Sequence, residues 1–91
     1  MNPETIQQQL AELSGWTHSD GMIRKTYTFK NFVEATAWTV HVAFLAEAHG
    51  HHPDIDIRYN RVSLALVTHD AGNQVTQKDL DLARAIEAIG E

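Results

Sequence analysis

The sequence predicts one α+β domain over residues 1–91, with a four-stranded antiparallel sheet, helices packed on one face of it, and the element order α-β-β-α-β-β-α. Three observations lead to this prediction. The chain of 91 residues is long enough for one hydrophobic core only. Apolar residues recur at helical spacing in three segments and alternate with polar residues in the segments between them. Strands joined as hairpins pair antiparallel, so the helices between and after them can cover only one face of the sheet.

Composition excludes several classes of protein. With 43% apolar and 21% charged residues, the chain has the make-up of a folded domain. Its net charge is −5 and its seven basic residues are scattered, which argues against a nucleic-acid partner. The absence of cysteine excludes disulfides and thiolate metal sites. No signal-peptide pattern and no apolar stretch near the roughly 18–20 residues of a membrane span are found, so we expect no membrane association and a cytoplasmic location.

The first helix is predicted over residues 3–13. Ile6, Leu10 and Leu13 form a narrow apolar stripe at helical spacing. Ser14-Gly15 follows the stripe directly, so we expect the helix to end there.

A β-hairpin is predicted next, between Trp16 and Phe29. Its turn is expected at residues 18–21, which read His-Ser-Asp-Gly. From Ile23 to Lys30, apolar or long side chains alternate with polar ones, as in a strand with one buried face.

A long central helix is the most distinct element of the sequence. Asn31 followed by Glu34 is typical of a capping box. Gly50 stands where a left-handed residue would end the helix, and Pro53 prevents the helix from resuming. Residues 51–53 therefore form a tight exit loop. The apolar repeat that predicts the helix consists of Val33, Ala37, Val40, Phe44 and Ala48.

The last third of the chain predicts a second hairpin and a final helix. Residues 55–59 alternate, Asn60-Arg61 offers a turn, and residues 62–69 form a β-rich run. After a loop at residues 70–73, Thr76 with Asp79 repeats the capping pattern. The apolar residues of the final helix are Leu82, Ala85, Ile86 and Ile89. A sheet of four short strands leaves exposed edges, so we expect edges of different subunits to pair.

Histidines gather around two predicted element ends. His49, His51 and His52 lie at the exit of the central helix, and His69 closes the last strand. Glu47 precedes His51 by four residues, so its carboxylate can approach that imidazole across the helix end and fix the tautomer. Because His52 precedes Pro53, its backbone is extended and its ring is aimed away from that of His51, so the two rings can serve different ends of one pocket.

Some positions have two interpretations. In a regular strand, His69 would start on the uncovered face of the sheet, unless the end of the strand turns it. Asp79 is explained by helix capping, although it can also border a pocket, and Trp16 is either a core residue or a platform for a ligand. The remaining histidines, His18 and His41 among them, are interpreted as surface residues.

The run from Glu47 to Pro53, Glu-Ala-His-Gly-His-His-Pro, followed by Tyr59-Asn60, Thr68-His69 and Asp79, resembles the signature of the pterin-4a-carbinolamine dehydratase family. Gly15-Trp16, the Phe-Lys-Asn-Phe run at 29–32 and Leu-Asp-Leu-Ala at 80–83 resemble this family too. The resemblance implies an α+β fold, homodimers or homotetramers, and no metal or organic cofactor. It implies dehydration of 4a-hydroxytetrahydrobiopterin to quinonoid dihydrobiopterin, which recycles the cofactor of aromatic amino acid hydroxylases.

The resemblance also implies roles for single residues. His51, His52 and His69 would be the functional histidines and Glu47 their acidic neighbour. The pterin would be bound by Gly50, His51, His52, Val67, Thr68, His69 and Asp70, with Trp16 and Asp79 beside them. Two departures bear on substrate preference: Lys78 stands where an arginine often precedes the aspartate, and Gly50 where many relatives carry a polar or acidic residue.

The residue types suit this reaction. Expelling hydroxide from a carbinolamine requires one proton delivered to the leaving oxygen and one removed from the ring nitrogen, and histidine, with an unperturbed pKa of about 6.5, can do either. We hypothesise that His51 and His69 exchange these protons on opposite sides of C4a, that His52 holds the hydroxyl or the ring, and that Glu47 orients an imidazole. Two alternatives remain: a zinc or copper site formed by the histidines and Glu47, and an interaction module, since animal relatives also serve as a dimerisation cofactor for a homeodomain transcription factor.

Overall fold

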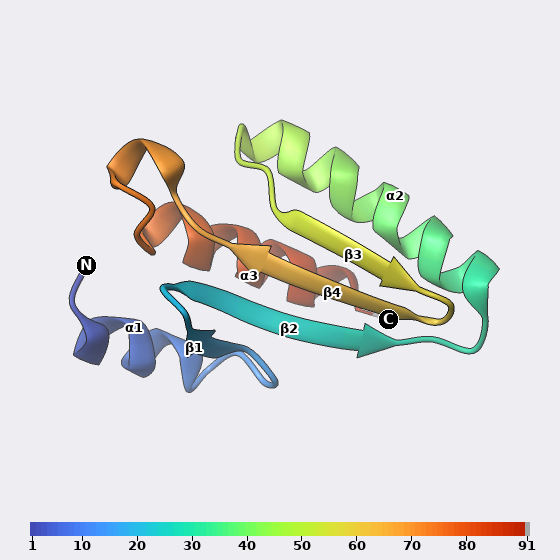
Figure 1. The fold of residues 1–91 in the computed structure, drawn as a ribbon, viewed down its shortest axis with the longest axis horizontal. Helices are drawn as coiled ribbons and strands as arrows, with labels where there is room; N and C mark the ends of the chain where they lie inside the picture. The colour runs from blue at the N-terminus through green and yellow to red at the C-terminus, as the bar shows by residue number, and fades with distance from the viewer. Residues whose placement is uncertain (91) are drawn as a thin grey trace.

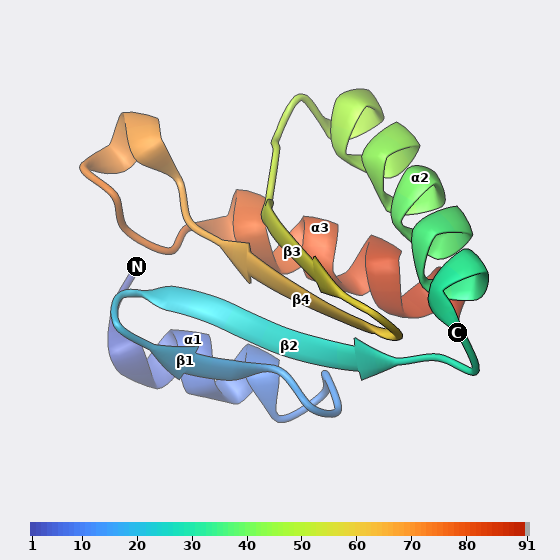
Figure 2. The same ribbon diagram turned by 45° about the vertical axis from the view of Figure 1, so that its right-hand side comes forward.

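Four antiparallel strands form one sheet, in the order β1-β2-β4-β3, in a computed structural model that describes residues 1–90. The helices lie together behind this sheet, and its other face is free of helices (Figures 1 and 2). The predicted fold class and element order are therefore confirmed. The elements are α1 (Pro3–Leu10), β1 (Thr17–Ser19), β2 (Met22–Thr28), α2 (Phe32–His49), β3 (Asp54–Arg58), β4 (Arg61–Leu66), the short 3₁₀ helix η1 (His69–Ala71) and α3 (Gln77–Ile89).

The N-terminal elements differ from the prediction at their ends. Helix α1 ends at Leu10 instead of residue 13, and the chain continues in turns that still bring Leu13 into the core. The predicted turn is shorter than expected, because residues 18 and 19 belong to β1 and only Asp20-Gly21 connects the strands. Both turn residues have a positive φ, 53° and 76°, the geometry that a two-residue hairpin turn requires.

The second hairpin is displaced by one residue. Its turn is Tyr59-Asn60 instead of Asn60-Arg61, and β4 ends at Leu66 instead of His69. Beyond β4, the backbone of Thr68 pairs with that of Gln74, and η1 begins at His69. Since His69 lies outside the strand, strand alternation does not determine where its side chain points.

Helix α2 has its predicted ends but is apolar on two opposite sides. The Asn31 side chain accepts a hydrogen bond from the backbone of Glu34 at 2.9 Å, and Gly50 is left-handed with φ 62°. The repeat that predicts the helix lies on its outer side, where Val33, Val40 and Phe44 are 74%, 52% and 72% exposed. The opposite side is in the core, through Ala35, Trp38, Val42 and Ala46.

A charged cluster lies at the edge of the core, between β2 and α3. Oε1 of Glu87 accepts hydrogen bonds from Lys25 Nζ at 2.5 Å, Tyr27 Oη at 2.7 Å and Trp16 Nε1 at 2.9 Å. Burial of Glu87 raises its pKa, but the hydrogen bonds from Lys25, Tyr27 and Trp16 and the charge of Lys25 outweigh this effect and lower the pKa below its ordinary value. The ionised form of Glu87 therefore stabilises the folded state.

Replacing Glu87 by glutamine is expected to reduce the free energy of unfolding by about 1–3 kcal/mol at pH 7, the range for hydrogen bonds to a charged group. Because the folded-state pKa lies below the unfolded-state value, this stabilisation is present above the unfolded pKa and is lost as the pH falls through the folded pKa. Urea unfolding at pH 7 and at about pH 3 measures both effects. A stability difference between wild type and Glu87→Gln that is the same at both pH values would contradict this account.

Candidate active site

Two distant stretches of chain, at the exit of α2 and after the end of β4, line one pocket of about 150 Å³ together with Lys78 at the start of α3. In Figure 1 these two stretches are the loop between α2 and β3 and the orange segment between β4 and α3. The pocket contains the three histidines predicted to act together. It is lined by Gly50, His51, His52, Thr68, His69, Asp70 and Lys78.

The end of α2 separates the two adjacent imidazoles. Left-handed Gly50 ends the helix, and the backbone N–H of His51 donates to the carbonyl of Ala46 at 3.0 Å. As a result, the His51 side chain points inward and is 11% exposed, whereas that of His52 points outward and is 67% exposed. The two adjacent rings therefore lie in different surroundings.

His51 is held by a buried carboxylate. Its Nε2 lies 2.5 Å from Oδ1 of Asp79, which has no solvent exposure. The other oxygen of Asp79, Oδ2, accepts hydrogen bonds from the hydroxyl of Thr68 and the backbone N–H of Thr76, both at 2.8 Å. Asp79 therefore completes the predicted capping box of α3 and also binds His51. An ionised carboxylate only accepts hydrogen bonds, so Nε2 of His51 carries a proton and Nδ1 of the neutral ring is an acceptor.

Glu47 pairs with His52 instead of His51, which corrects the expectation from helical spacing. Its Oε1 lies 2.9 Å from Nε2 of His52, and both side chains are largely exposed. The left-handed turn at Gly50 explains the difference, because it carries His51 beneath the end of the helix and leaves the next residue on the outside with Glu47. An exposed pair of this kind adds little stability, but it restricts the orientation of the His52 ring.

His69 has a neutral partner. Its Nδ1 lies 2.8 Å from Oδ1 of Asn73, a residue with a positive φ of 59° in the turn after η1. The amide oxygen accepts a hydrogen bond, so Nδ1 carries the proton and Nε2 of the neutral ring is the acceptor. His51 and His69 therefore hold opposite tautomers.

Several predicted binding residues do not line the pocket. Trp16 is buried in the core with its Nε1 bonded to Glu87, which supports its interpretation as a core residue and places it outside the pocket lining. Val67 is also buried outside the pocket lining. Sequence reasoning did not place Lys78 or Asn73 at the site. Lys78 had one signal, its position directly before Asp79, whereas Asn73 had none beyond its position in a predicted loop.

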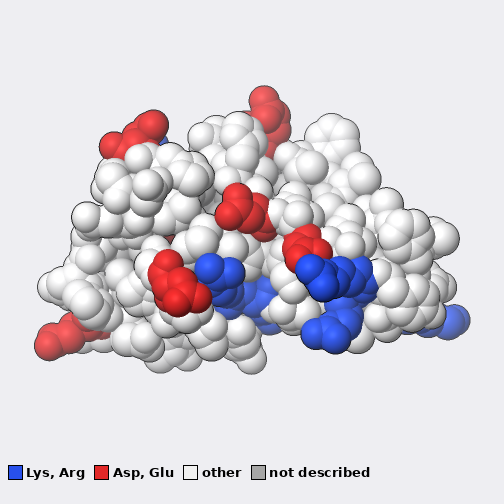
Figure 3. Space-filling model, in the orientation of Figure 1, with Lys and Arg blue, Asp and Glu red and all other residues white. Residues whose placement is uncertain are grey.

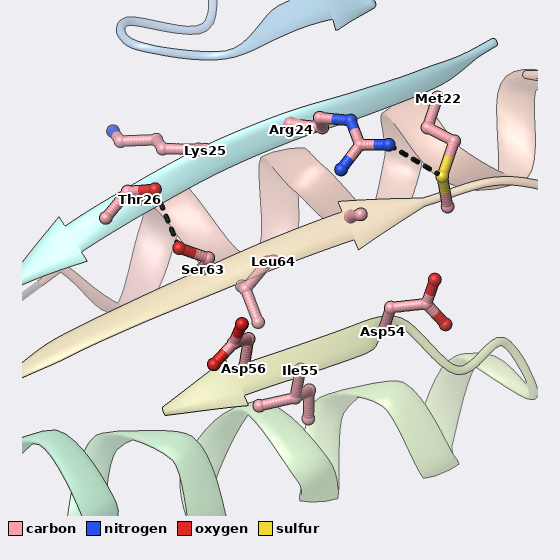
Figure 4. A pocket seen from close by; sticks show the side chains of 10 residues that line it. Met22, Arg24, Lys25, Thr26, Asp54, Ile55, Asp56, Ser63 and Leu64 are labelled. Atoms are coloured by element: carbon pink, nitrogen blue, oxygen red, sulfur yellow. Dashed lines mark hydrogen bonds between the residues drawn. The ribbon is translucent and has the colours of Figure 1, made fainter. Parts of the chain in front are cut away.

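A larger hollow, about 370 Å³, lies on the helix-free face of the sheet (Figure 4). Its wall on β2 includes Arg24, which contacts the sulfur of Met22. The hydroxyls of Thr26 and Ser63 are bonded to each other at 2.8 Å. On this face, basic side chains stand beside acidic ones (Figure 3). The hollow is lined by no histidine, so it lacks the side chain whose unperturbed pKa lies near neutral pH.

The structure also bears on the metal and membrane expectations. Within residues 1–90, no three His, Cys, Asp or Glu side chains are arranged so that they could hold a metal ion. His49 is not in the pocket lining, and the carboxylates at the site are bonded to separate imidazoles. Across the same residues, every helix falls short of the length and apolarity needed to cross a membrane.

Comparison with known proteins gives consistent similarities. Residues 1–89 match the family model described as pterin 4 alpha carbinolamine dehydratase. A candidate pterin-4-alpha-carbinolamine dehydratase from a Roseiflexus species is 56% identical over 84 residues, 92% of this chain and 89% of that protein. One from Chloroflexus aurantiacus is 57% identical with the same coverage.

Solved structures extend the similarity to the fold. A transcriptional coactivator/pterin dehydratase from Brucella melitensis superposes with a TM-score of 0.92 at 33% identity, over 100% of this chain and 98% of that one. A pterin dehydratase-like RuBisCO assembly factor of the alpha-carboxysome has a TM-score of 0.64 at 20% identity, covering 80% of this chain and 83% of that one, and shares the fold alone.

Proposed function

The chain belongs to the pterin 4 alpha carbinolamine dehydratase family, whose members are hydro-lyases, and we propose that it dehydrates 4a-hydroxytetrahydrobiopterin by histidine acid/base catalysis. The observation that carries this proposal is the meeting of His51 and His69 in one pocket with opposite tautomers. One ring nitrogen of each imidazole is then free to exchange a proton with a substrate.

The surroundings of the two rings suggest which is the base. When Nδ1 of His51 takes the proton from the pterin ring nitrogen, the imidazolium forms beside the buried carboxylate of Asp79, which stabilises the positive charge. The ring of His69 is hydrogen-bonded to a neutral amide instead of a carboxylate, so its cationic form, with a second proton on Nε2, would give that proton to the leaving hydroxyl. The C4a–O bond breaks, water leaves, and a C=N bond forms at the ring nitrogen. His52, held by Glu47 at the open side, would contact the hydroxyl or the ring.

In this scheme His51 takes one proton from the pterin and His69 gives one to the leaving oxygen, so the proposed step needs neither a metal nor an organic cofactor. The product would be quinonoid dihydropterin, and the chain would serve the recycling of a tetrahydropterin cofactor.

The direct test measures dehydration of 4a-hydroxytetrahydrobiopterin against the uncatalysed reaction, beside binding of an oxidised pterin. We expect catalysis that persists in chelator. Failure to accelerate dehydration would reject the proposal, and loss of activity in chelator that returns with zinc would favour the metal alternative.

We also propose that the chain forms a homodimer or homotetramer through the outer side of α2. Val40, Ala43 and Phe44 form an apolar surface there that is unusual for a helix facing solvent. A second copy of this surface would bury it around a two-fold axis.

Replacing Phe44 by glutamate is expected to shift the assembly toward monomers, because it places a charge in the middle of this apolar surface. Light scattering after size-exclusion chromatography measures the mass in solution. The matched control, Gln8→Glu, adds the same charge to an exposed position of α1 and should leave the mass unchanged. An unaltered mass for Phe44→Glu would show that this surface does not carry the assembly.

A further inference from the structure

We propose that the hydroxyl of Thr68 is a positioning group that keeps Asp79 ionised, and thereby keeps His51 in the tautomer that accepts a proton. This inference rests on the proposed function. Thr68 is buried and directly precedes His69. Its hydroxyl is hydrogen-bonded to the carboxylate of Asp79, which also binds His51. The same hydroxyl is hydrogen-bonded to Asp79 and Thr76 and not to His51, so its influence on the His51 tautomer passes through Asp79.

The hydrogen bonds around Thr68 run in one direction. Because the carboxylate of Asp79 can only accept, the Thr68 hydroxyl donates to Oδ2 at 2.8 Å. The same hydroxyl oxygen lies 2.7 Å from the hydroxyl of Thr76, which must then be the donor of that pair. Thr76 Oγ1 in turn accepts from the backbone N–H of Lys78 at 3.3 Å. The acceptor at Asp79 therefore determines which atom donates in each of these hydrogen bonds. Hydrogen bonds aligned in this way strengthen one another.

Asp79 depends on these donors for its charge. A carboxylate without solvent exposure stays ionised only if hydrogen bonds replace the lost water. Three donors reach it: Thr68 and the Thr76 backbone at Oδ2, and His51 at Oδ1. Without Thr68, a larger share of the stabilisation must come from His51. A proton on the carboxyl group then becomes less costly.

A protonated Asp79 would reverse the role of His51. The carboxyl group would donate to Nε2 of the neutral imidazole, and the ring proton would move to Nδ1. That nitrogen could no longer accept a proton from a substrate. The Thr68 hydroxyl donates its single hydrogen to Asp79, so it has none to donate to a bound pterin.

Two substitutions separate this role from simple packing. Thr68→Val keeps the shape and removes the hydroxyl, and Thr68→Ser keeps the hydroxyl. For Thr68→Val we expect kcat to fall about tenfold, the effect of one hydrogen bond to a charged group, with KM within about twofold of wild type. Thr68→Ser should restore kcat. The matched control is Thr36→Val in α2, because the buried hydroxyl of Thr36 has no hydrogen-bond partner in the described residues and its loss should leave kcat unchanged.

Nitrogen-15 chemical shifts of the His51 ring provide a readout that does not depend on activity. In wild type, neutral His51 should carry its proton on Nε2, and in Thr68→Val a measurable fraction should carry it on Nδ1. Wild-type kcat in Thr68→Val, or a fall in kcat without any change of tautomer, would overturn the inference. If wild type fails to accelerate dehydration, the proposed function is rejected, whereas the tautomer comparison still decides whether Thr68 positions Asp79.

Discussion

Alanine at position 51 is expected to lower kcat/KM for carbinolamine dehydration by about 10²–10⁴-fold, the usual contribution of a general acid or base. The substitution removes the imidazole that would accept the proton and leaves nothing at that place that titrates near neutral pH. The loss of kcat/KM in His69→Ala is expected to lie in the same range, because both protons must move for water to leave. The measurement is the initial rate of dehydration after subtraction of the uncatalysed reaction.

The matched control for His51→Ala is His49→Ala. His49 lies two residues away, is exposed at the end of α2 and does not line the pocket. Its removal should change the rate by less than about twofold. Since His51→Ala also leaves the Asp79 carboxylate with one donor fewer, unfolding should be followed on the same samples, so that loss of folded protein is not counted as loss of catalysis. Wild-type rates in both His51→Ala and His69→Ala would rule out the mechanism.

Replacing Asp79 by alanine is expected to cost about 3–5 kcal/mol of folding stability, the range for removing one partner of a buried charged pair. The side chains of His51 and Thr68 and the backbone N–H of Thr76 would all lose their acceptor, and α3 would lose its capping box. Urea unfolding followed by circular dichroism measures this loss. For a small domain, it is a large fraction of the whole stability.

Two further variants show whether the loss of stability in Asp79→Ala comes from the buried carboxylate. Asp81→Ala removes an exposed carboxylate two residues along the same helix and should cost less than about 1 kcal/mol. Asp79→Asn keeps the size of the side chain but not its charge, so it should lower the dehydration rate by about tenfold or more in a protein that still folds. If Asp79→Ala is as stable as Asp81→Ala, the hydrogen bonds at Asp79 do not have the importance assigned to them.

Most of the fold follows from local patterns in the sequence. The caps at Asn31, Gly50 and Thr76 and the two periodicities identify the three α-helices and the four strands, but not the 3₁₀ helix η1. The ends of the elements were less predictable. Leu13 continues the helical spacing of Ile6 and Leu10, but it reaches the core from a turn after α1 has ended. The sequence also could not say which side of α2 faces the sheet, since both sides are apolar and only the fit of Trp38 and its neighbours against the core decides.

The sequence indicated which residues lie at the candidate site better than it indicated which of them are hydrogen-bonded to one another. The positions of His51, His52 and His69 at element ends indicated that they would meet. Their partners depended on backbone geometry: one left-handed residue, Gly50, decides which imidazole Glu47 can reach. The second use of Asp79 was hidden for a different reason. Capping explained the residue fully, and nothing in the local sequence required a histidine from another segment to approach it.

The double use of Asp79 has a consequence for the maturation of the protein. The same carboxylate that starts the last helix also orders a ring contributed some thirty residues earlier, so the pocket is complete only after the C-terminal segment has docked. A chain still emerging from the ribosome, or one clipped before residue 79, would have its histidines but not the group that orients the inward-facing one. Under the proposed function, we therefore expect activity only after the segment that contains Asp79 has packed beside His51.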